Sequence, residues 1–269
     1  MTEKETDKEQ VVFRYNLSGE KIQEIKNGGK TLAEAFFTTK AIGRDPMKLC
    51  PLLGVDKERF ARPHQIHGFQ TRQIAEEFFL LGDGVRKMLL DGVDAVIYNV
   101  KNACIGISTA DCIPVVVYDT EHHCAAAIHA GWRGTLERIV VRAIENLSKS
   151  FRTKPENLRC IIGPGISMES FEVGEEVYDA FLQKGFPVDS FAVRRLAKHN
   201  RTSENLSADI PWKWHLDIKE CNRQQLISLG VKEENIMILD VDTMTDERFY
   251  SARREGAETG RMLSGIILR

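Results

Sequence analysis

The chain has 269 residues, of which 42% are hydrophobic and 28% are charged, a composition typical of a globular protein and not of an extended disordered chain. Its 37 basic and 39 acidic side chains give a formal net charge of -2, so no overall basic excess favours nucleic acid or an anionic membrane surface. No run of residues approaches the roughly 18 uninterrupted apolar positions that a membrane helix needs. We therefore expect neither nucleic acid nor a membrane as a partner.

The start of the chain is polar. Residues 1–10 are almost all polar or charged, and they predict a disordered tail without the apolar core of a signal peptide. We therefore expect a cytoplasmic protein with reduced thiols. The six cysteines include no C-x-x-C pair, which excludes zinc ribbons and thioredoxin-like redox centres. The sequence makes no prediction of the oligomeric state.

Short runs of β-branched and apolar residues predict strands along the chain. Most of these runs lie close together in the sequence, which favours hairpins within a mixed, largely antiparallel sheet. The polar segment 194–209 lacks periodicity and predicts an exposed loop. The predicted strands cover residues 11–15, 93–100, 104–108, 114–118, 124–128 and 235–240.

Apolar residues at helical spacing predict three helices, over residues 136–151, 172–184 and 217–229. Thr135 is the expected N-cap of the first helix because its hydroxyl can accept from a free N–H group. Strands and helices in this pattern predict an α+β fold, a layered α/β arrangement with helices packed on sheet faces. Since no linker or repeat divides the chain, we expect residues 11–269 to form a single domain.

Three residues near predicted strand ends carry the side chains that zinc prefers. His129 ends an apolar strand, Cys112 lies between two apolar strands, and His67 precedes a glycine. If those strands are neighbours, Cys112 and His129 converge at the rim of the sheet. Two imidazoles and a thiolate suit Zn(II) and leave a fourth position open, as in catalytic sites. The spacing of these residues fits equally well an alternative without a metal, in which Cys112 is a small buried residue and the histidines are structural. For Asp111, both orientation of a ligand and capping of a turn remain open.

Two groups of arginines are candidates for phosphate binding. Arg133 lies in the glycine-bearing loop HAGWRGT before a predicted helix, whose free N–H groups favour anions. A surface arginine packed on Trp132 fits the same pattern. Arg253, Arg254 and Arg261 form a second basic group, for which phosphate binding and solvated charge balanced by glutamates both remain open.

At these residues the chain resembles a known family. The motifs HQIHG, DGVDAVI, STADCIPVVVYD, AAAIHAGWRGT and RFYSARREGAETGR are similar to those of the multicopper polyphenol oxidase (laccase) domain family. That family includes peptidoglycan editing factors and laccase-domain purine nucleoside phosphorylases. The resemblance spans residues 11–269 and implies a fold related to the cysteine hydrolase-like fold.

The resemblance also implies roles for individual residues. The zinc ligands of the family fall on His67, Cys112 and His129. It implies catalytic roles for Cys112, His129 and Arg133, and it assigns substrate or phosphate binding to Arg133 and Arg253. The implied activity is zinc-dependent phosphorolysis of adenosine, inosine and methylthioadenosine, together with deamination of adenosine. Purine nucleosides and phosphate are therefore the expected small-molecule partners.

Other functions remain open at this point. Cys112 as a thiolate nucleophile with His129 as its base fits a cysteine-type amidase that edits a peptidoglycan precursor. A non-catalytic metal-binding or partner-binding module is a further alternative. A copper-dependent polyphenol oxidase is disfavoured, because a multicopper oxidase needs about ten histidines, largely in His-x-His pairs. This chain has seven histidines and no such pair, although copper itself suits the His-Cys-His donors.

Overall fold

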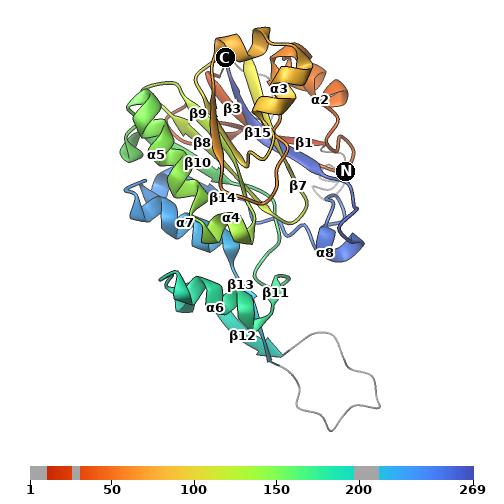
Figure 1. The fold of residues 1–269 in the computed structure, drawn as a ribbon, viewed down its shortest axis with the longest axis vertical. Helices are drawn as coiled ribbons and strands as arrows, with labels where there is room; N and C mark the ends of the chain where they lie inside the picture. Colours follow the sequence, from red (N-terminus) through yellow and green to blue (C-terminus); the bar gives the residue numbers. More distant parts are fainter. Residues whose placement is uncertain (1–10, 26–30, 197–211) are drawn as a thin grey trace, which may run out of the picture.

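The computed structural model describes residues 11–25, 31–196 and 212–269. The tail predicted over residues 1–10 lies outside these ranges, and so does most of the loop predicted over 194–209. Within the described residues, the strands form two six-stranded sheets and one three-stranded sheet, with helices packed around them (Figure 1). This arrangement confirms the predicted α+β class.

The first sheet combines strands from both ends of the chain in the order β2-β1-β3-β15-β7-β4. Its neighbouring strands are antiparallel, except β4 and β7, which are parallel. The C-terminal strand β15 therefore joins the N-terminal strands to a strand from the middle of the chain. The bounds are β1 (Val12–Asn16), β2 (Gln23–Glu24), β3 (Ala33–Thr38), β4 (Phe60–Ala61), β7 (Ala103–Thr109) and β15 (Met262–Leu268).

The second sheet has the order β14-β10-β8-β9-β6-β5. The pairs β10–β14 and β5–β6 are parallel, and the remaining pairs are antiparallel. Strands β8 and β9 are buried at every residue, as expected for apolar runs covered on both faces. The bounds are β5 (Thr71–Ile74), β6 (Ala95–Tyr98), β8 (Ile113–Asp119), β9 (Ala125–Ala130), β10 (Leu158–Ile162) and β14 (Ile236–Ile238).

The helices differ widely in length, and no helix among the described residues is long and apolar enough to cross a membrane. The α-helices are α2 (Pro46–Leu53), α3 (Asp83–Leu89), α4 (Trp132–Leu136), α5 (Ile139–Phe151), α6 (Glu175–Gln183), α7 (Ile218–Ser228) and α8 (Ala252–Glu255). Short 3-10 helices cover Lys57–Arg59, Glu76–Leu80, Pro155–Asn157, Val188–Ser190 and Glu233–Asn235.

The central strands of the second sheet are buried on both faces, and their successive side chains point to opposite sides. Val116 and Ala127 belong to the core that the two large sheets share with Ile105. Val117 and Ile144 belong to a second core, which is covered by α5 and α7 (Figure 1). The two large sheets and these helices thus form successive layers.

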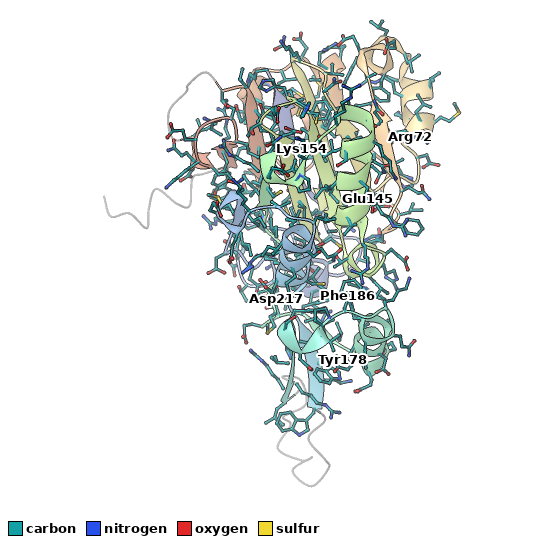
Figure 2. All side chains as sticks on the ribbon, turned by 90° about the vertical axis from the view of Figure 1, so that its left-hand side faces the viewer. Arg72, Glu145, Lys154, Tyr178, Phe186 and Asp217 are labelled. Atoms are coloured by element: carbon teal, nitrogen blue, oxygen red, sulfur yellow. The ribbon has the colours of Figure 1, made fainter. Side chains whose placement is uncertain are left out.

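A small three-stranded sheet with α6 lies at one end of the molecule (Figure 1). Its strands are β11 (Glu172–Val173), β13 (Trp212–Leu216) and β12 (Ala192–Leu196), in that order. In Figure 2, Asp217 and Phe186 lie where this sheet meets the main body, and Tyr178 lies farther toward the end. Tyr178 stacks on Trp214 with ring centroids 3.7 Å apart, which joins α6 to β13.

Each predicted strand overlaps an observed strand, but the prediction of one sheet is wrong. Strand β7 pairs with β15 and β4, whereas β6, β8 and β9 pair with one another in the second sheet. The β8–β9 hairpin confirms the expectation of hairpins. An apolar run shows that a strand is buried, but it does not show which distant strand supplies its hydrogen bonds.

The helix predictions also need correction. The helix predicted over 136–151 is interrupted at Arg138, whose φ of 58° separates α4 from α5. Thr135 is not an N-cap, because it lies inside α4, where its buried hydroxyl accepts a hydrogen bond from Asn222. The first residues of the predicted segment 172–184 form β11, and residues 194–196 of the predicted loop belong to β12.

Candidate metal centre

Three potential metal ligands come together at one end of the second sheet. In the β8–β9 pair, Pro114 lies opposite His129, so Cys112, just before β8, comes close to His129. The loop between β4 and β5 brings His67 to the same place. One potential ligand atom from each of the three residues lies within 4.8 Å of the others, and the two imidazole centroids are 5.0 Å apart. The convergence expected from neighbouring strands is therefore present.

A buried carboxylate holds two of these residues in position. Asp94 Oδ1 lies 2.7 Å from Nδ1 of His129, which leaves Nε2 as the nitrogen of that ring available to a metal. The same carboxylate accepts hydrogen bonds from the backbone N–H groups of Ile66, His67 and Gly68, at 3.3, 3.0 and 2.8 Å. His67 has a φ of 60°, a sparsely populated conformation that these bonds help to hold.

Burial and charge set the protonation of this centre. Burial raises the pKa of the Cys112 thiol, but the charge of His129 and hydrogen bonds from both histidines lower it more, to about 6. Burial lowers the pKa of His129, but the charge of Cys112 and the hydrogen bond to Asp94 raise it to about 9. A thiolate, the form that binds metals and attacks electrophiles, is thus favoured beside an imidazolium at neutral pH.

Two glycines of the HAGWRGT motif allow close packing around the centre. A Cβ atom on Gly131 would lie 3.0 Å from Sγ of Cys112, and one on Gly134 would lie 2.9 Å from the carbonyl oxygen of Gly68. Any larger residue would push the α4 segment away from Cys112 or from the His67 loop. These glycines therefore bring three chain segments together.

Arg133 lies beside the centre on α4 and lines the same cleft. Its guanidinium carbon lies 4.3 Å from the centroid of the Trp132 ring, the packing that one interpretation of the sequence predicted. Within the described part of the chain, no carboxylate forms an ion pair with it. Because α4 has only five residues, its dipole adds little to anion binding, so the guanidinium must supply the positive charge.

The second arginine group divides into different roles. Arg253 lines the cleft, and its Nη1 donates to the carbonyl oxygen of Glu172 at 2.8 Å. Arg254 donates to the carbonyl oxygens of Thr243, Met244 and Phe249, so it holds the loop before α8. Arg261 also lines the cleft, and it donates to carbonyl oxygens close to it in the sequence.

Asp111 connects the C-terminal motif to the Cys112 loop. Its carboxylate accepts hydrogen bonds from the hydroxyl groups of Thr243 and Ser251 at 2.7 and 3.0 Å, and from the backbone N–H of Arg253 at 2.7 Å. The Asp111 carboxylate therefore contacts the C-terminal motif, and the predicted alternative in which it orients a ligand is not what these contacts show. The carboxylate that orients a potential ligand, His129, is Asp94, whose role was not predicted. Its signal was a single acidic residue inside the apolar run VDAVIY.

The three potential ligands lie in a cleft with a volume of about 1200 Å³. Trp132 and Phe171 contribute aromatic surface to its lining, and Ser108 and Gln65 contribute polar groups. Gln65 is fixed by two hydrogen bonds with the backbone of Ser108, which attach the loop before His67 to β7. The cleft therefore offers aromatic, polar and cationic groups next to a rigidly held donor cluster.

The other histidines and cysteines lie elsewhere. His122 and His123 occupy the β8–β9 turn and contact Asp119 and Tyr118, and the buried His215 contacts the carbonyl oxygen of Met168. His199 lies outside the described residues. All six cysteines are free, and every one except Cys112 is buried.

Known proteins similar to this chain share most of its length. The sequence model of the family described as multi-copper polyphenol oxidoreductase laccase matches residues 38–269. A purine nucleoside phosphorylase of Bacteroides thetaiotaomicron is 39% identical over 212 residues, which cover 78% of this chain and 74% of that protein. An adenosine deaminase from an unknown prokaryotic organism is 33% identical over 221 residues, covering 82% of this chain and 79% of that protein.

Solved structures with the same fold are also found. The hypothetical protein YfiH of Bacillus licheniformis superposes with a TM-score of 0.75 at 23% identity, covering 88% of this chain and 93% of that one. YlmD from Geobacillus stearothermophilus gives a TM-score of 0.72 at 25% identity, covering 88% and 92%. The chain therefore belongs to the multi-copper polyphenol oxidoreductase laccase family.

Proposed function

We propose that this protein is a zinc-dependent purine nucleoside phosphorylase that acts on adenosine, inosine and methylthioadenosine and also deaminates adenosine. The observation that carries the proposal is the cluster of His67, Cys112 and His129 beside the unpaired guanidinium of Arg133 in one cleft. Relatives named for both activities support it. In this proposal, residues 11–269 act as one domain.

The donor set fits zinc. A thiolate and two imidazoles are the ligands that Zn(II) prefers, and Asp94 fixes the tautomer of His129 as an outer carboxylate does in zinc sites. When bound by these residues, the ion supplies Lewis acidity toward an oxygen of a ligand in the cleft. Copper suits the same donors, but this is the only cluster of three or more such residues among those described. Polyphenol oxidase chemistry at several coppers is therefore disfavoured.

In phosphorolysis, an oxygen of inorganic phosphate attacks the anomeric carbon of the ribose. The bond from that carbon to N9 breaks, its electron pair remains on the purine, and ribose 1-phosphate forms. In this proposal Arg133 binds the phosphate and Arg253 adds a second positive charge. The lack of a carboxylate partner for the Arg133 guanidinium in the described structure supports this role. Trp132 and Phe171 supply aromatic surface for the purine ring.

Deamination uses the same cleft but needs no phosphate. Water adds to C6 of the adenine ring, ammonia leaves, and inosine is formed. The inosine is then itself a substrate for phosphorolysis, so one cleft suffices for both reactions. The two reactions differ in their need for Arg133.

A second candidate is a cysteine-type amidase acting on a peptidoglycan precursor. The observation that favours it is the order Cys112, His129 and Asp94, which matches a nucleophile, a base and the carboxylate that orients the base. The sulfur would attack the amide carbon, the amine would leave with a proton from His129, and water would hydrolyse the thioester. The predicted likeness to the cysteine hydrolase-like fold accords with this candidate and remains a prediction.

One experiment separates the two candidates. Metal-replete, chelator-treated and zinc-restored protein are each incubated with adenosine, with and without phosphate, and the products are resolved by chromatography. We expect inosine under both conditions, adenine, hypoxanthine and ribose 1-phosphate only with phosphate, and loss of all turnover after chelation. Turnover that persists after complete removal of zinc contradicts the proposal. A covalent adduct of an amide substrate on Cys112 supports the amidase.

A further inference from the structure

The cleft contains more positive charge than a neutral nucleoside and one phosphate require. Its two acidic lining residues already have partners in the described structure. Asp111 accepts three hydrogen bonds, and Asp91 lies 2.7 Å from Nδ1 of His64. The basic residues that line the cleft are Arg44, Arg62, Lys87, Arg133, Arg253 and Arg261.

Arg44, Arg62 and Lys87, here called the distal basic cluster, lie on different elements from Arg133 and Arg253. Arg44 precedes α2, Arg62 follows β4, and Lys87 belongs to α3. Nη1 of Arg62 donates to the carbonyl oxygen of Arg44 at 3.1 Å.

Helix α3, which carries Lys87, is attached to the segment that carries Arg62. Arg86, next to Lys87, donates to the carbonyl oxygens of Glu58 and Phe60 at 3.1 and 2.6 Å. These bonds hold the start of the Arg62 segment against the helix. The three basic residues thus occupy one connected part of the wall.

The charges of the distal basic cluster are not neutralised by the protein. Within the described residues, none of its three members forms an ion pair with a carboxylate. Burial and the nearby charge of Arg44 lower the pKa of Arg62. The three side chains remain accessible to solvent. An anion that binds between neighbouring like charges relieves their repulsion, so the cluster is suited to an anionic ligand.

We propose that the distal basic cluster binds a phosphoryl group and forms a second anion subsite of the cleft, separate from Arg133 and Arg253. This inference rests on the proposed function and specifies the substrate of that cleft. One guanidinium group can donate two parallel hydrogen bonds to two phosphate oxygens, and Lys87 adds a point charge. The phosphoryl group belongs either to free inorganic phosphate or to the 5′-phosphate of a purine nucleotide.

Equilibrium binding to the zinc-loaded protein tests the subsite without any turnover. The ligands are inorganic phosphate, inosine 5′-monophosphate and inosine, each measured alone so that no phosphorolysis occurs. The variants are Arg62→Gln, Arg44→Gln and the charge-retaining Arg62→Lys. The matched control is Arg72→Gln, because Arg72 is exposed on β5 outside the cleft (Figure 2).

Removing the Arg62 charge should weaken phosphoryl binding about tenfold or more, the usual effect of losing one charge-assisted hydrogen bond. If free phosphate is the natural ligand, its Kd rises. If the ester is the natural ligand, the Kd of inosine 5′-monophosphate rises and that of phosphate does not. In both cases the Kd of inosine stays within about twofold, and Arg62→Lys retains most of the affinity.

Several results overturn the inference. The inference is overturned if Arg62→Gln and Arg44→Gln bind both phosphoryl ligands as tightly as Arg72→Gln does. It is also overturned if the wild-type protein binds neither phosphoryl ligand. A variant that loses as much affinity for inosine as for the phosphoryl ligands also contradicts the inference, because the substitution has then disturbed the whole cleft. If Arg62→Gln unfolds at a lower temperature than the control, Arg44→Gln and Arg62→Lys decide. Because no turnover is measured, a protein without phosphorylase activity still yields a clear result for the subsite.

Discussion

Asp94 offers the sharpest test of how the candidate metal centre is held. Replacing Asp94 with Asn keeps the size of the side chain but puts an NH₂ group among four donors, namely the His129 ring and the N–H groups of residues 66–68. At least one hydrogen bond to a charged acceptor is lost, which costs about 1.5–3 kcal/mol of folding free energy. Because the His129 tautomer and the His67 loop are both released, zinc affinity should fall about 10–100-fold.

Asp119→Asn is a matched control. Asp119 is also fully buried, accepts two backbone N–H bonds and contacts a histidine Nδ1, but it is the last residue of β8 and does not line the cleft. Zinc affinity is measured by competition with a chromophoric chelator, and stability by urea unfolding of the metal-free protein. Both variants should lose stability, and only Asp94→Asn should lose zinc affinity. Equal zinc affinities for the two variants would refute the assigned role of Asp94.

Three further predictions concern the cleft and the loop behind it. Arg133→Ala should reduce phosphorolysis of adenosine about tenfold or more while deamination changes little, because only phosphorolysis needs the phosphate; equal losses argue against phosphate binding. In metal-free protein, iodoacetamide should modify Cys112 before the five buried cysteines, and zinc should protect it; mass-spectrometric mapping to another cysteine contradicts this. Burial raises the pKa of Asp242, but hydrogen bonds from Ser170 and Ser167 lower it more, to below 3.8. The stabilising effect of the Asp242 carboxylate is therefore present at neutral pH and lost as the pH falls below 3.8. The stability deficit of Asp242→Asn in urea unfolding should shrink in acid for this reason. A deficit that does not depend on pH contradicts the role assigned to these hydrogen bonds.

The sequence was most informative where burial alone decides the structure. Strands β8 and β9 are covered on both faces, so their apolar runs predict them directly. The pairing of β7 with β15 joins distant parts of the chain, and no local pattern predicts it. The break at Arg138 carries no glycine or proline signal, and the apolar spacing continues across it, so periodicity alone predicts one helix.

The candidate site shows the same division. The convergence of Cys112 and His129 follows from the hairpin that joins β8 and β9, and the local sequence predicts that hairpin. Asp94 acts through backbone N–H groups of a loop that only the tertiary fold brings to it. The distal basic cluster was not predicted because its members are separated along the chain: Arg44 precedes α2, Arg62 follows β4 and Lys87 lies in α3.

Titration of zinc into metal-free protein, with ribose 1-phosphate formation from adenosine and phosphate as the readout, tests the central claim most directly. The His67, Cys112 and His129 cluster predicts a rate that rises linearly with zinc and reaches its plateau at about one ion per chain, as expected for a single three-ligand catalytic site. A phosphorolysis rate that is independent of added zinc would contradict the account.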